Sequence, residues 1–351
     1  MKILVRKAIT DIYTLTDRKS KKFLGGNSLP GLKYITMKHS YLTLLILILL
    51  GTFSSKAQQD PQYTQYMYNT QVVNPAYAGN REALSFGLLY RTQWVNFGKG
   101  APNTGTFTVN SPVAENMGLG LSVVNDRIGP SVETNFNIDY SYSINTSETT
   151  KLSFGLKAGL DILDLDYSRL NLPRDLYSDP YFDENNIDNK LQPQIGAGIY
   201  YNTEKFYAGL SVPNFLTTKH FDKSSIGNTS VETTAAERMH YFLIAGYVFD
   251  LSDNLKFKPA TLFKMVSGSP LQADVSANFL IYDKFTLGAA YRWSAAMSGL
   301  VGFQATDQIF IGFAYDYQTT DIEAYSDGSY EIMFRFELFN RPERVLTPRF
   351  F

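Results

Sequence analysis

The sequence predicts an all-β protein: a transmembrane antiparallel up-and-down β-barrel of fourteen strands with an N-terminal plug or rim segment. Three observations indicate this fold class. Apolar and polar residues alternate with period two in repeated segments between residues 84 and 339, a secretory signal precedes them, and short connections alternate with long ones. Period two is strand geometry, because successive side chains point to opposite faces. A closed barrel is the form in which a sheet satisfies every backbone group in lipid.

The segment 151–161 shows the alternation most clearly. Leu156 and its alternate neighbours are apolar, whereas Lys157 and Asp161 lie on the other face together with serine and glycine. One face of this strand therefore suits lipid and the other suits a polar lumen.

An export signal lies near the N-terminus. A cationic stub after Met37 is followed by the apolar run 41–50 and then by Ser55-Lys56-Ala57, which offers small residues where a signal peptidase reads. We expect cleavage after Ala57. The apolar run is shorter than the roughly 18 residues that a membrane-spanning helix needs.

Four regions follow from this reading. Residues 1–57 are a leader and signal peptide, of which 1–36 are a false upstream start or part of an unusually long signal. Residues 58–83 form a periplasmic or plug segment. Residues 84–339 form the barrel, and residues 340–351 form a short tail. This organisation predicts a protein exported to the cell outer membrane, with membrane lipids around it.

Charge and cysteine content exclude several classes of function. Without residues 1–57 the chain keeps 22 Lys/Arg against 31 Asp/Glu, a net charge of −9. No excess of basic residues remains to neutralise phosphates, so we expect no nucleic-acid partner. The absence of cysteine excludes a lipoprotein, a disulfide scaffold and a thiolate metal site.

Fourteen candidate strands can be counted along the chain. The segments starting near 104, 240 and 296 alternate less regularly, so twelve or sixteen strands remain alternatives, as does a soluble β-sandwich. The candidate strands begin near Leu84, Thr104, Met117, Glu133, Lys151, Leu191, Phe206, His240, Leu255, Leu271, Phe285, Ala296, Ile309 and Ser329.

The connections between these strands alternate in length. Short polar turns and long loops on opposite sides are the layout of an outer-membrane barrel with both termini in the periplasm, and they favour an even strand number. The short turns are 111–116, 145–150, 202–205, 250–254, 282–284 and 305–308, and the longest loops are 162–190, 213–239 and 319–328.

Two features depart from simple alternation. Pro259 falls inside the ninth strand, where its missing N–H requires a bulge or a ladder break. Residues 241–249 are apolar on both faces, which indicates that one face meets a plug or a partner instead of water.

Charged residues gather on the face predicted to line the lumen. We interpret them as a salt-bridge and water network that fills the interior; a selective channel is the alternative, although the mixed signs form no single-sign ring. Trp94 and Trp293, at strand ends on the long-loop side, are interpreted as interfacial anchors. The predicted lumen charges are Arg91, Asp139, Lys157, Asp161, Lys258, Lys264, Asp274, Arg292, Asp316, Arg335 and Glu337.

The sequence after residue 57 contains no recognisable catalytic or metal-binding motif. After residue 57 the only histidines are His220 and His240, which exclude a histidine metal cluster, and the run 209–213 lacks the final glycine of a nucleophile elbow. The acidic loop 162–190 offers oxygen ligands for calcium but matches no EF-hand spacing, so a solvated loop is the simpler interpretation. We expect no enzyme activity, no cofactor and no metal.

The stretch before the first strand is rich in aromatic and amide side chains. Such a segment packs inside the barrel as a plug or lies against its rim. Rigid aromatic residues with amide neighbours are also typical of a docking surface, so partner binding is a second hypothesis. The residues concerned are Gln62, Tyr63, Tyr66, Tyr68, Asn69, Asn74, Pro75, Tyr77 and Gly79.

Several motifs, taken in order, closely resemble the PorP/SprF family of the Bacteroidota type IX secretion system over residues 58–340. The resemblance implies an outer-membrane barrel that works with the type IX secretion and gliding machinery. It also implies support for the secretion or surface attachment of large adhesin-type cargo with a type B C-terminal domain, and no enzyme activity. The motifs are QDPQYTQYMYNTQVVNPAYAGNRE, LLYRTQWVNFGKGAPNTGTFTVNSPV, GLGLSVVNDRIGP, YAGLSVPNF and HYFLIAGYVFDLSDNLKFKP.

Two other functional classes compete with this one. An outer-membrane channel for hydrophobic small molecules requires a continuous apolar track through the lumen and a lateral opening, whereas the predicted lumen face is heavily charged. An outer-membrane lipase requires His220 or His240 paired with a serine inside the barrel. The leading hypothesis is a non-enzymatic membrane anchor that binds an exported protein or a machinery subunit through its loops and N-terminal segment.

Overall fold

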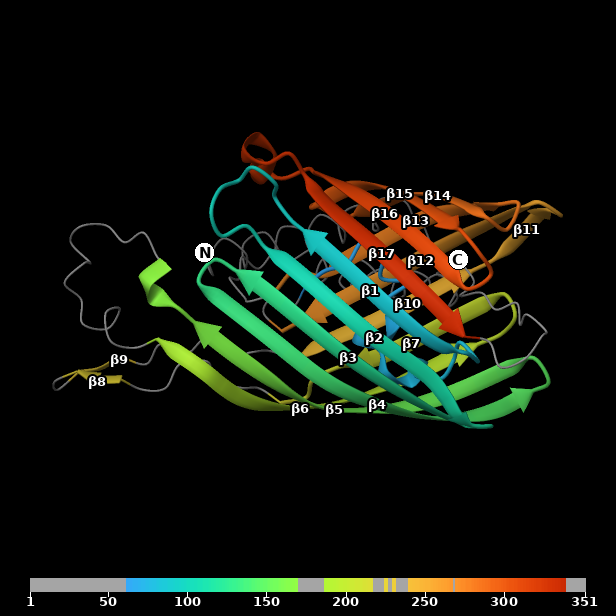
Figure 1. Cartoon of the computed structure of the whole chain (residues 1–351), viewed down its shortest axis with the longest axis horizontal. Coiled ribbons are helices and arrows are strands. Elements are labelled where there is room, and N and C mark those ends of the chain that lie inside the picture. The colour runs from blue at the N-terminus through green and yellow to red at the C-terminus, as the bar shows by residue number, and fades with distance from the viewer. Residues whose placement is uncertain are drawn as a thin grey trace, which may run out of the picture. The chain divides into compact units, whose positions relative to one another are not determined.

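The computed structural model describes residues 61–169, 186–216, 224–226, 229–231, 239–267 and 269–338 of the 351-residue chain. All of them belong to one compact unit, residues 54–351. Tilted antiparallel strands form its wall (Figure 1).

Most of the described residues are in strands. A separate two-stranded hairpin consists of β8 (Ser224–Ile226) and β9 (Thr229–Val231). The wall consists of β1 (Leu84–Thr92), β2 (Asn103–Ala114), β3 (Met117–Ile128), β4 (Ser131–Ser147), β5 (Thr150–Leu165), β6 (Ile187–Asn202), β7 (Phe206–Val212), β10 (His240–Tyr247), β11 (Phe249–Ser252), β12 (Leu255–Val266), β13 (Gln272–Ile281), β14 (Phe285–Arg292), β15 (Ala296–Gln304), β16 (Ile309–Gln318) and β17 (Ser329–Leu338).

The wall closes on itself. From β1 to β7 and from β11 to β17 each strand pairs with the next along the chain, β1 pairs with β17, and β10 pairs with both β7 and β12. Because β11 continues β10 along β12, the ring contains 14 strands. The predicted fold class, a 14-stranded antiparallel up-and-down barrel, is confirmed.

The starts of the strands agree closely with the sequence pattern. The largest difference is in β6, which begins at Ile187 instead of Leu191, because it stays paired with β5 beyond a register shift between Leu163 and Leu165. β4, β5 and β6 are 17, 16 and 16 residues long. A tilted strand crosses the apolar core of a bilayer in roughly 9–11 residues, so these three strands extend past it.

The ladder break expected at Pro259 is present. Pairs between β10 and β12 stop at Gly246–Ala260 and resume in β11 at Phe249–Phe257. The ring nitrogen of proline donates no hydrogen bond, which explains why the eighth strand is divided into β10 and β11. On the other side of β12, Pro259 pairs with Ala277 without a shift.

Exposure alternates along the strands as the sequence pattern predicts. In β5 the Leu156 side chain is 63% exposed and the next residue, Lys157, is 3% exposed. Large apolar side chains cover the outside of the wall, whereas the buried core lies inside it. The register is therefore that of a barrel with an apolar outer face.

Helical structure in the described residues is short. It consists of α3 (Thr70–Val73) and the 3₁₀ turns η1 (Pro75–Tyr77), η2 (Tyr167–Arg169) and η4 (Asp321–Tyr325). No helix in this part of the chain is both long enough and apolar enough to cross a membrane.

Candidate functional site: a plug held inside the barrel

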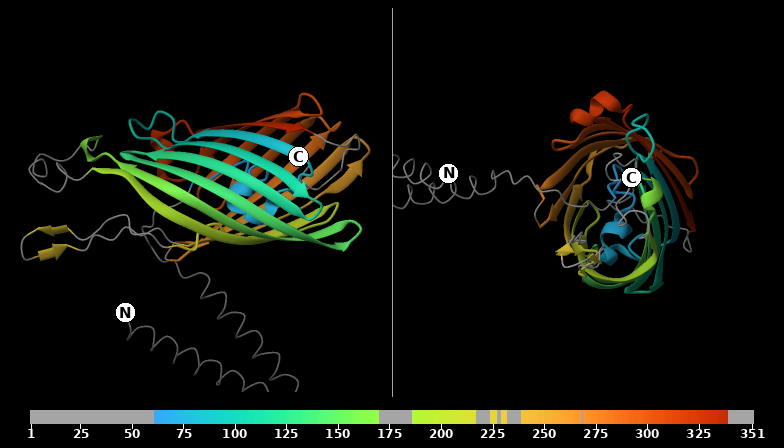
Figure 2. Two further views of the ribbon diagram at one scale, coloured as in Figure 1. Left: turned by 60° about the horizontal axis from the view of Figure 1, so that its bottom comes forward. Right: turned by 90° about the vertical axis from the view of Figure 1, so that its left-hand side faces the viewer.

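Residues 61–83, here called the plug, lie within the ring of strands. Figure 2 shows this segment in blue inside the barrel, and η1 contacts β4, β5 and β6. Tyr63, Tyr66 and Tyr77 are buried in one apolar cluster with wall residues such as Tyr200 and Phe242. Of the two arrangements that the sequence left open, plug and rim, the structure shows the plug.

The start of the plug binds acidic side chains of the wall. The backbone N–H groups of Thr64 and Gln65 donate to the two carboxylate oxygens of Glu331 at 2.9 and 2.8 Å. The Thr64 hydroxyl donates to Asp316 at 2.7 Å. Hydrogen bonds to ionised acceptors are the stronger kind, so this end of the plug is firmly held.

These carboxylates belong to a charge cluster of five buried residues, Arg91, Asp274, Arg292, Asp316 and Glu331. Arg91 joins two of them, with its Nη2 2.6 Å from Asp316 and its Nη1 3.1 Å from Glu331. Arg292 Nε lies 2.9 Å from Asp274 and its Nη1 lies 3.9 Å from Asp316. Loss of one partner from such a buried set leaves an uncompensated charge, which costs far more than loss of a surface pair.

The middle of the plug binds the neighbouring strands β2, β3 and β4 through a second polar group. Gln71 Nε2 donates to Asp139 at 3.3 Å and to the carbonyls of Val109 and Leu121 at 3.2 and 3.1 Å. Asp139 in turn lies 3.0 Å from the ammonium of Lys157. The amide therefore fastens the plug to β2, β3 and β4 together.

Around η1 the plug is bound by neutral groups. Ser211 and Ser141 each donate to a plug carbonyl at 2.6 Å, of Val73 and Ala78 respectively. Asn74 Nδ2 donates to the carbonyl of Ile199 at 3.1 Å. These bonds fix η1 against β4, β6 and β7.

Glycine makes this close approach possible. A Cβ at Gly155 of β5 would collide with the backbone of Pro75 and Ala76, and a Cβ at Gly118 of β3 would collide with Ala78. The period-two pattern predicts that such residues face inward, but it does not indicate that another backbone needs the space.

The end of the plug binds β17. Arg81 pairs with Glu337, which also lies 3.6 Å from Arg335 Nε. The Arg335 guanidinium lies over the rings of Phe310 at 4.8 Å and Tyr68 at 5.7 Å. Both ends of the plug therefore depend on the last strand.

All the predicted lumen charges lie on the inner face and are buried. The structure brings many of them into direct contact, in the charge cluster, in the Asp139–Lys157 pair and in the Arg335–Glu337 pair. Lys258 lies over the Tyr207 ring at 5.4 Å and Lys264 over the Phe242 ring at 5.8 Å. The residues are Arg91, Asp139, Lys157, Asp161, Lys258, Lys264, Asp274, Arg292, Asp316, Arg335 and Glu337.

The residues of the docking hypothesis belong to the plug and therefore lie inside the lumen. They contact the barrel wall, so a docking role requires a partner that reaches the interior or draws the segment out. Gln62 is half-buried and donates to Gln272 at 2.8 Å. Tyr68 and Gly79 are half-buried as well, and the buried members are Tyr63, Tyr66, Asn69, Asn74, Pro75 and Tyr77.

Sequence reasoning missed Glu331 and the plug residues that bind charge. Glu331 lies four residues before Arg335 on β17, and residues an even number apart face the same side of a strand. The alternation that places Arg335 inward therefore also places Glu331 inward. Thr64, Gln71 and Arg81 lie in a segment without periodic alternation, so only the folded structure shows their contacts.

Catalysis and metal binding receive no support from the described residues. Among these residues, no group of three or more His, Asp or Glu side chains is placed so that it could hold a metal ion. His240 is buried and stacks on Phe242 with 6.3 Å between ring centroids. His220 and most acidic residues of the loop 162–190 lie outside the described residues.

The carboxyl group of Asp166, at the start of that loop, has local partners. Hydrogen bonds from the hydroxyl and backbone N–H of Ser168 hold the pKa of this carboxyl below its ordinary value. Asp164 accepts from the backbone N–H of Asn189 at 2.7 Å. These two oxygen ligands of the calcium hypothesis are thus already used within the loop.

The predicted interfacial anchors lie directly after strands. Trp94 lies two residues after the end of β1, and its ring is tilted against that of Phe97 with 5.9 Å between the centroids, whereas Trp293 follows β14 at once and is highly exposed. Their depth in a bilayer remains a prediction.

Comparison with known proteins gives one match to a family. Residues 55–336 match the sequence model of the family described as type IX secretion system membrane protein PorP/SprF. No curated protein sequence matches the chain.

Solved structures with similar folds are membrane barrels of low sequence identity. The CymD monoaromatic hydrocarbon channel shares 14% identity, with 79% of this chain and 93% of that chain covered and a TM-score of 0.45. Omp33 of Acinetobacter baumannii shares 9%, with 74% and 100% covered and a TM-score of 0.41. A FadL homologue of Pseudomonas aeruginosa shares 12%, with 81% and 95% covered and a TM-score of 0.39.

Proposed function

We propose that this chain, which belongs to the PorP/SprF family of type IX secretion system membrane proteins, is a non-enzymatic outer-membrane anchor for exported proteins. In this proposal it works with subunits of the secretion machinery. It supports the secretion or surface attachment of large adhesin-type cargo with a type B C-terminal domain.

The observation that carries the proposal is the family match, which spans almost the whole described chain. The plugged lumen is consistent with it. Charged and amide hydrogen bonds hold the plug to the wall from Thr64 to Arg81, so the barrel resembles a rigid support more than an open pore.

Partner contact, in our proposal, uses the loops and the beginning of the N-terminal segment. Gln62 is the second of the described residues and is only half-buried. The tyrosines behind it hold the plug in place through their packing. Substitution of Tyr63, Tyr66 and Tyr68 therefore acts on partner binding through the position of the segment.

The hydrophobic-channel hypothesis is less well supported. It requires a continuous apolar track, whereas the inner wall carries the charge cluster and the plug occupies the lumen.

Complementation of a deletion strain tests the proposed function. Full-length chain is expected to restore surface display of an adhesin, detected by antibody on intact cells, and to retain a cargo or machinery subunit in a detergent pull-down. Normal display without the protein, and without its paralogues, would contradict the anchor role.

Triple substitution of Tyr63, Tyr66 and Tyr68 separates bracing from docking. Alanine removes packing and hydroxyls, whereas the matched phenylalanine variant keeps the packing. We expect alanine to abolish display and phenylalanine to keep it, with heat-modifiable gel migration reporting whether the barrel is folded. Normal display by a folded alanine variant would rule out a role for these side chains.

The topology proposed with this function places the long loops outside the cell. Because the native chain has no cysteine, single cysteines report exposure directly. An impermeant maleimide is expected to label Ala324→Cys, in η4, on intact cells and not Ser147→Cys, the last residue of β4 before a short turn. The opposite pattern would invert the orientation.

A further inference from the structure

The barrel has two ends that differ in their connections. The long connections 93–102 and 319–328 lie at one end, here called the long-loop end, where β1 and β16 finish. Short turns such as 148–149 lie at the opposite end, here called the short-turn end, where β1 begins and β17 finishes. Because neighbouring strands are antiparallel, the position of a residue within its strand shows which end it is near.

The plug starts at the long-loop end. Gln62 donates to Gln272, which is the first residue of β13 and therefore lies at that end. The N–H of Thr64 donates to Glu331, the third residue of β17, which begins at the same end. Asp316, which accepts from the Thr64 hydroxyl, is the third residue from the end of β16.

The plug finishes at the short-turn end. Arg81 pairs with Glu337, the second-last residue of β17. Glu82 pairs with Lys151, the second residue of β5, which begins directly after a short turn. The described chain therefore crosses the whole lumen, from the long-loop end to the short-turn end, before β1 begins at Leu84.

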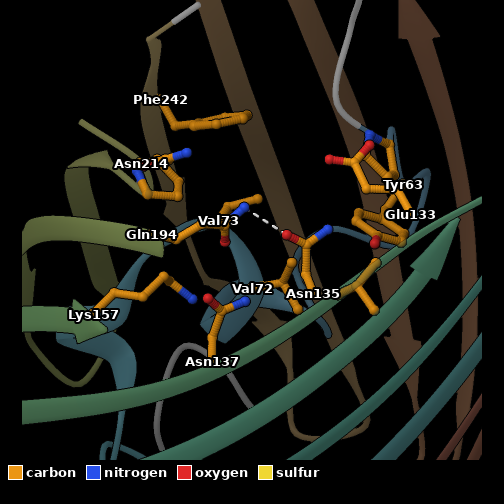
Figure 3. A pocket seen from close by; sticks show the side chains of 13 residues that line it. Tyr63, Val72, Val73, Glu133, Asn135, Asn137, Lys157, Gln194, Asn214 and Phe242 are labelled. Atoms are coloured by element: carbon orange, nitrogen blue, oxygen red, sulfur yellow. Dashed lines mark hydrogen bonds between the residues drawn. The ribbon is translucent and has the colours of Figure 1, made fainter. Parts of the chain in front are cut away.

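A polar hollow lies beside the start of the plug (Figure 3). Its volume is about 80 Å³, enough for a few waters. Pro61 and Gln62 are only half-buried, so the first described residues border free space at this end of the lumen. The hollow is lined from the plug by Pro61 and Tyr63, from the first five residues of β4 by Glu133 and Asn135, and from just after β7 by Asn214.

The residues before Pro61 have to continue from the long-loop end. With the cleavage expected after Ala57 they number three, 58–60. At roughly 3.6 Å per residue they span at most about 11 Å. β1 rises about 27 Å over its length, which is about 20 Å along the axis of a barrel whose strands tilt by about 40°. Three residues are thus too few to return to the short-turn end.

We propose that the amino terminus of the mature protein is displayed at the long-loop end and there contacts an exported protein on the cell surface. Display outside the cell rests on the proposed function, which places the long loops there. Amide side chains carry both donors and acceptors, so Gln62 and Asn135 at this mouth suit the backbone and polar side chains of a polypeptide. A periplasmic subunit of the machinery meets the short-turn end and the other end of the plug.

Cysteine labelling locates the amino-terminal residues. Asp60→Cys in the full-length chain, which has no native cysteine, is compared with Ala324→Cys in η4 and Ser147→Cys at the end of β4. An impermeant maleimide is expected to label Asp60→Cys on intact cells to the same extent as Ala324→Cys, and Ser147→Cys only after the outer membrane is permeabilised. Labelling of Asp60→Cys only after permeabilisation, or only after unfolding, would overturn the proposal.

The same three variants score the orientation of the barrel separately. Labelling of Ser147→Cys and not of Ala324→Cys on intact cells would contradict the orientation given under the proposed function, and with it display on the cell surface. Asp60→Cys that behaves as Ala324→Cys in that case would still support the path of the plug through the lumen.

Photocrosslinking tests the partner. p-Benzoylphenylalanine is placed at Asp60 and at Gln62 in turn, and heat-modifiable migration confirms that each barrel is folded. Irradiation of intact cells is expected to give an adduct from which proteinase K, added outside the cells, removes the partner chain. The matched control is the same group at Glu148, in the turn between β4 and β5, whose adducts are expected to resist the protease.

Mass spectrometry of the adduct identifies the partner chain, which is expected to carry a type B C-terminal domain. No adduct at either amino-terminal position, or adducts there that proteinase K leaves intact, would overturn the contact. An exported partner of another class would support the contact and contradict the cargo class of the proposed function.

Discussion

The plug is held by two arcs of the wall in different ways. On the charged arc, β1, β16 and β17, ionised side chains bind it: Glu331 and Asp316 accept from Thr64 and Gln65, and Arg91 binds both carboxylates. On the arc from β4 to β7, here called the neutral arc after the groups that bind η1, serine hydroxyls and Asn74 bind the plug. Ionised groups contribute there as well, since Asp139 accepts from Gln71 and Lys151 pairs with Glu82. The strongest hydrogen bonds to the plug thus come from one arc of the wall.

The largest expected effect is on the charged arc. Arg91→Ala leaves Asp316 and Glu331 buried without their shared cation, and loss of one partner of a buried pair costs about 3–5 kcal/mol. Urea unfolding in detergent micelles, followed by tryptophan fluorescence, measures the loss. The exposed Arg127→Ala is the control and is expected to change little. Equal unfolding midpoints for the two variants would remove the distinction between the arcs.

The next effect lies on the outer face of the neutral arc. Leu156→Arg puts a cation on the apolar surface of the wall at a cost of about 2–4 kcal/mol near the bilayer midplane. Leu156→Phe is the control and is expected to fold normally. Both are measured by unfolding in lipid vesicles; an arginine variant as stable as the parent would mean that this face does not meet lipid.

Thr64→Val tests the charged arc without removing a charge. It deletes a buried hydroxyl that donates to Asp316, and a hydrogen bond to a charged group contributes about 1.5–3 kcal/mol. Limited proteolysis of the folded protein near the plug, compared with the parent, gives a second measurement. A valine variant with unchanged stability and unchanged cleavage would show that the hydroxyl does not hold the plug.

Ser211→Ala is the matching change on the neutral arc and has the smallest expected effect. It deletes one hydroxyl that donates to the carbonyl of Val73, which is worth about 0.5–1.5 kcal/mol. The same unfolding assay compares it with Thr64→Val. A larger loss for Ser211→Ala than for Thr64→Val would reverse the ranking of the arcs.

Much of the wall could be predicted because the alternation of apolar and polar residues within each strand indicates its outward and inward faces. The alternation from Leu156 to Lys157 and the break at Pro259 are properties of single strands, and both are found as expected. The plug obeys no period. Its position depends on contacts between distant residues, such as Thr64 with Glu331, which no local pattern encodes.

Close approaches of the chain to glycines of the wall were also beyond local prediction. The sequence pattern places the start of β7 at Phe206, but the inward turn at Pro213 depends on the missing side chain of Gly196 on a neighbouring strand. Glycines at 155 and 118 raise the same difficulty for the plug, because each makes room for a backbone far away in sequence. A pattern of hydrophobicity indicates which face of a strand is buried. It does not indicate whether the space beside a glycine is filled by another part of the chain.

The bond between the first part of the described chain and its last strand also constrains the order of assembly. Thr64 and Glu331 are 267 residues apart, and Arg81 and Glu337 are 256 apart. During synthesis the plug emerges early and its acidic partners on β17 emerge last, at the moment when β17 can also pair with β1 and close the ring. A truncated or stalled chain without β17 therefore lacks both the bonds that hold the ends of the plug and the strand that pairs with β1. Addition of β17 supplies both.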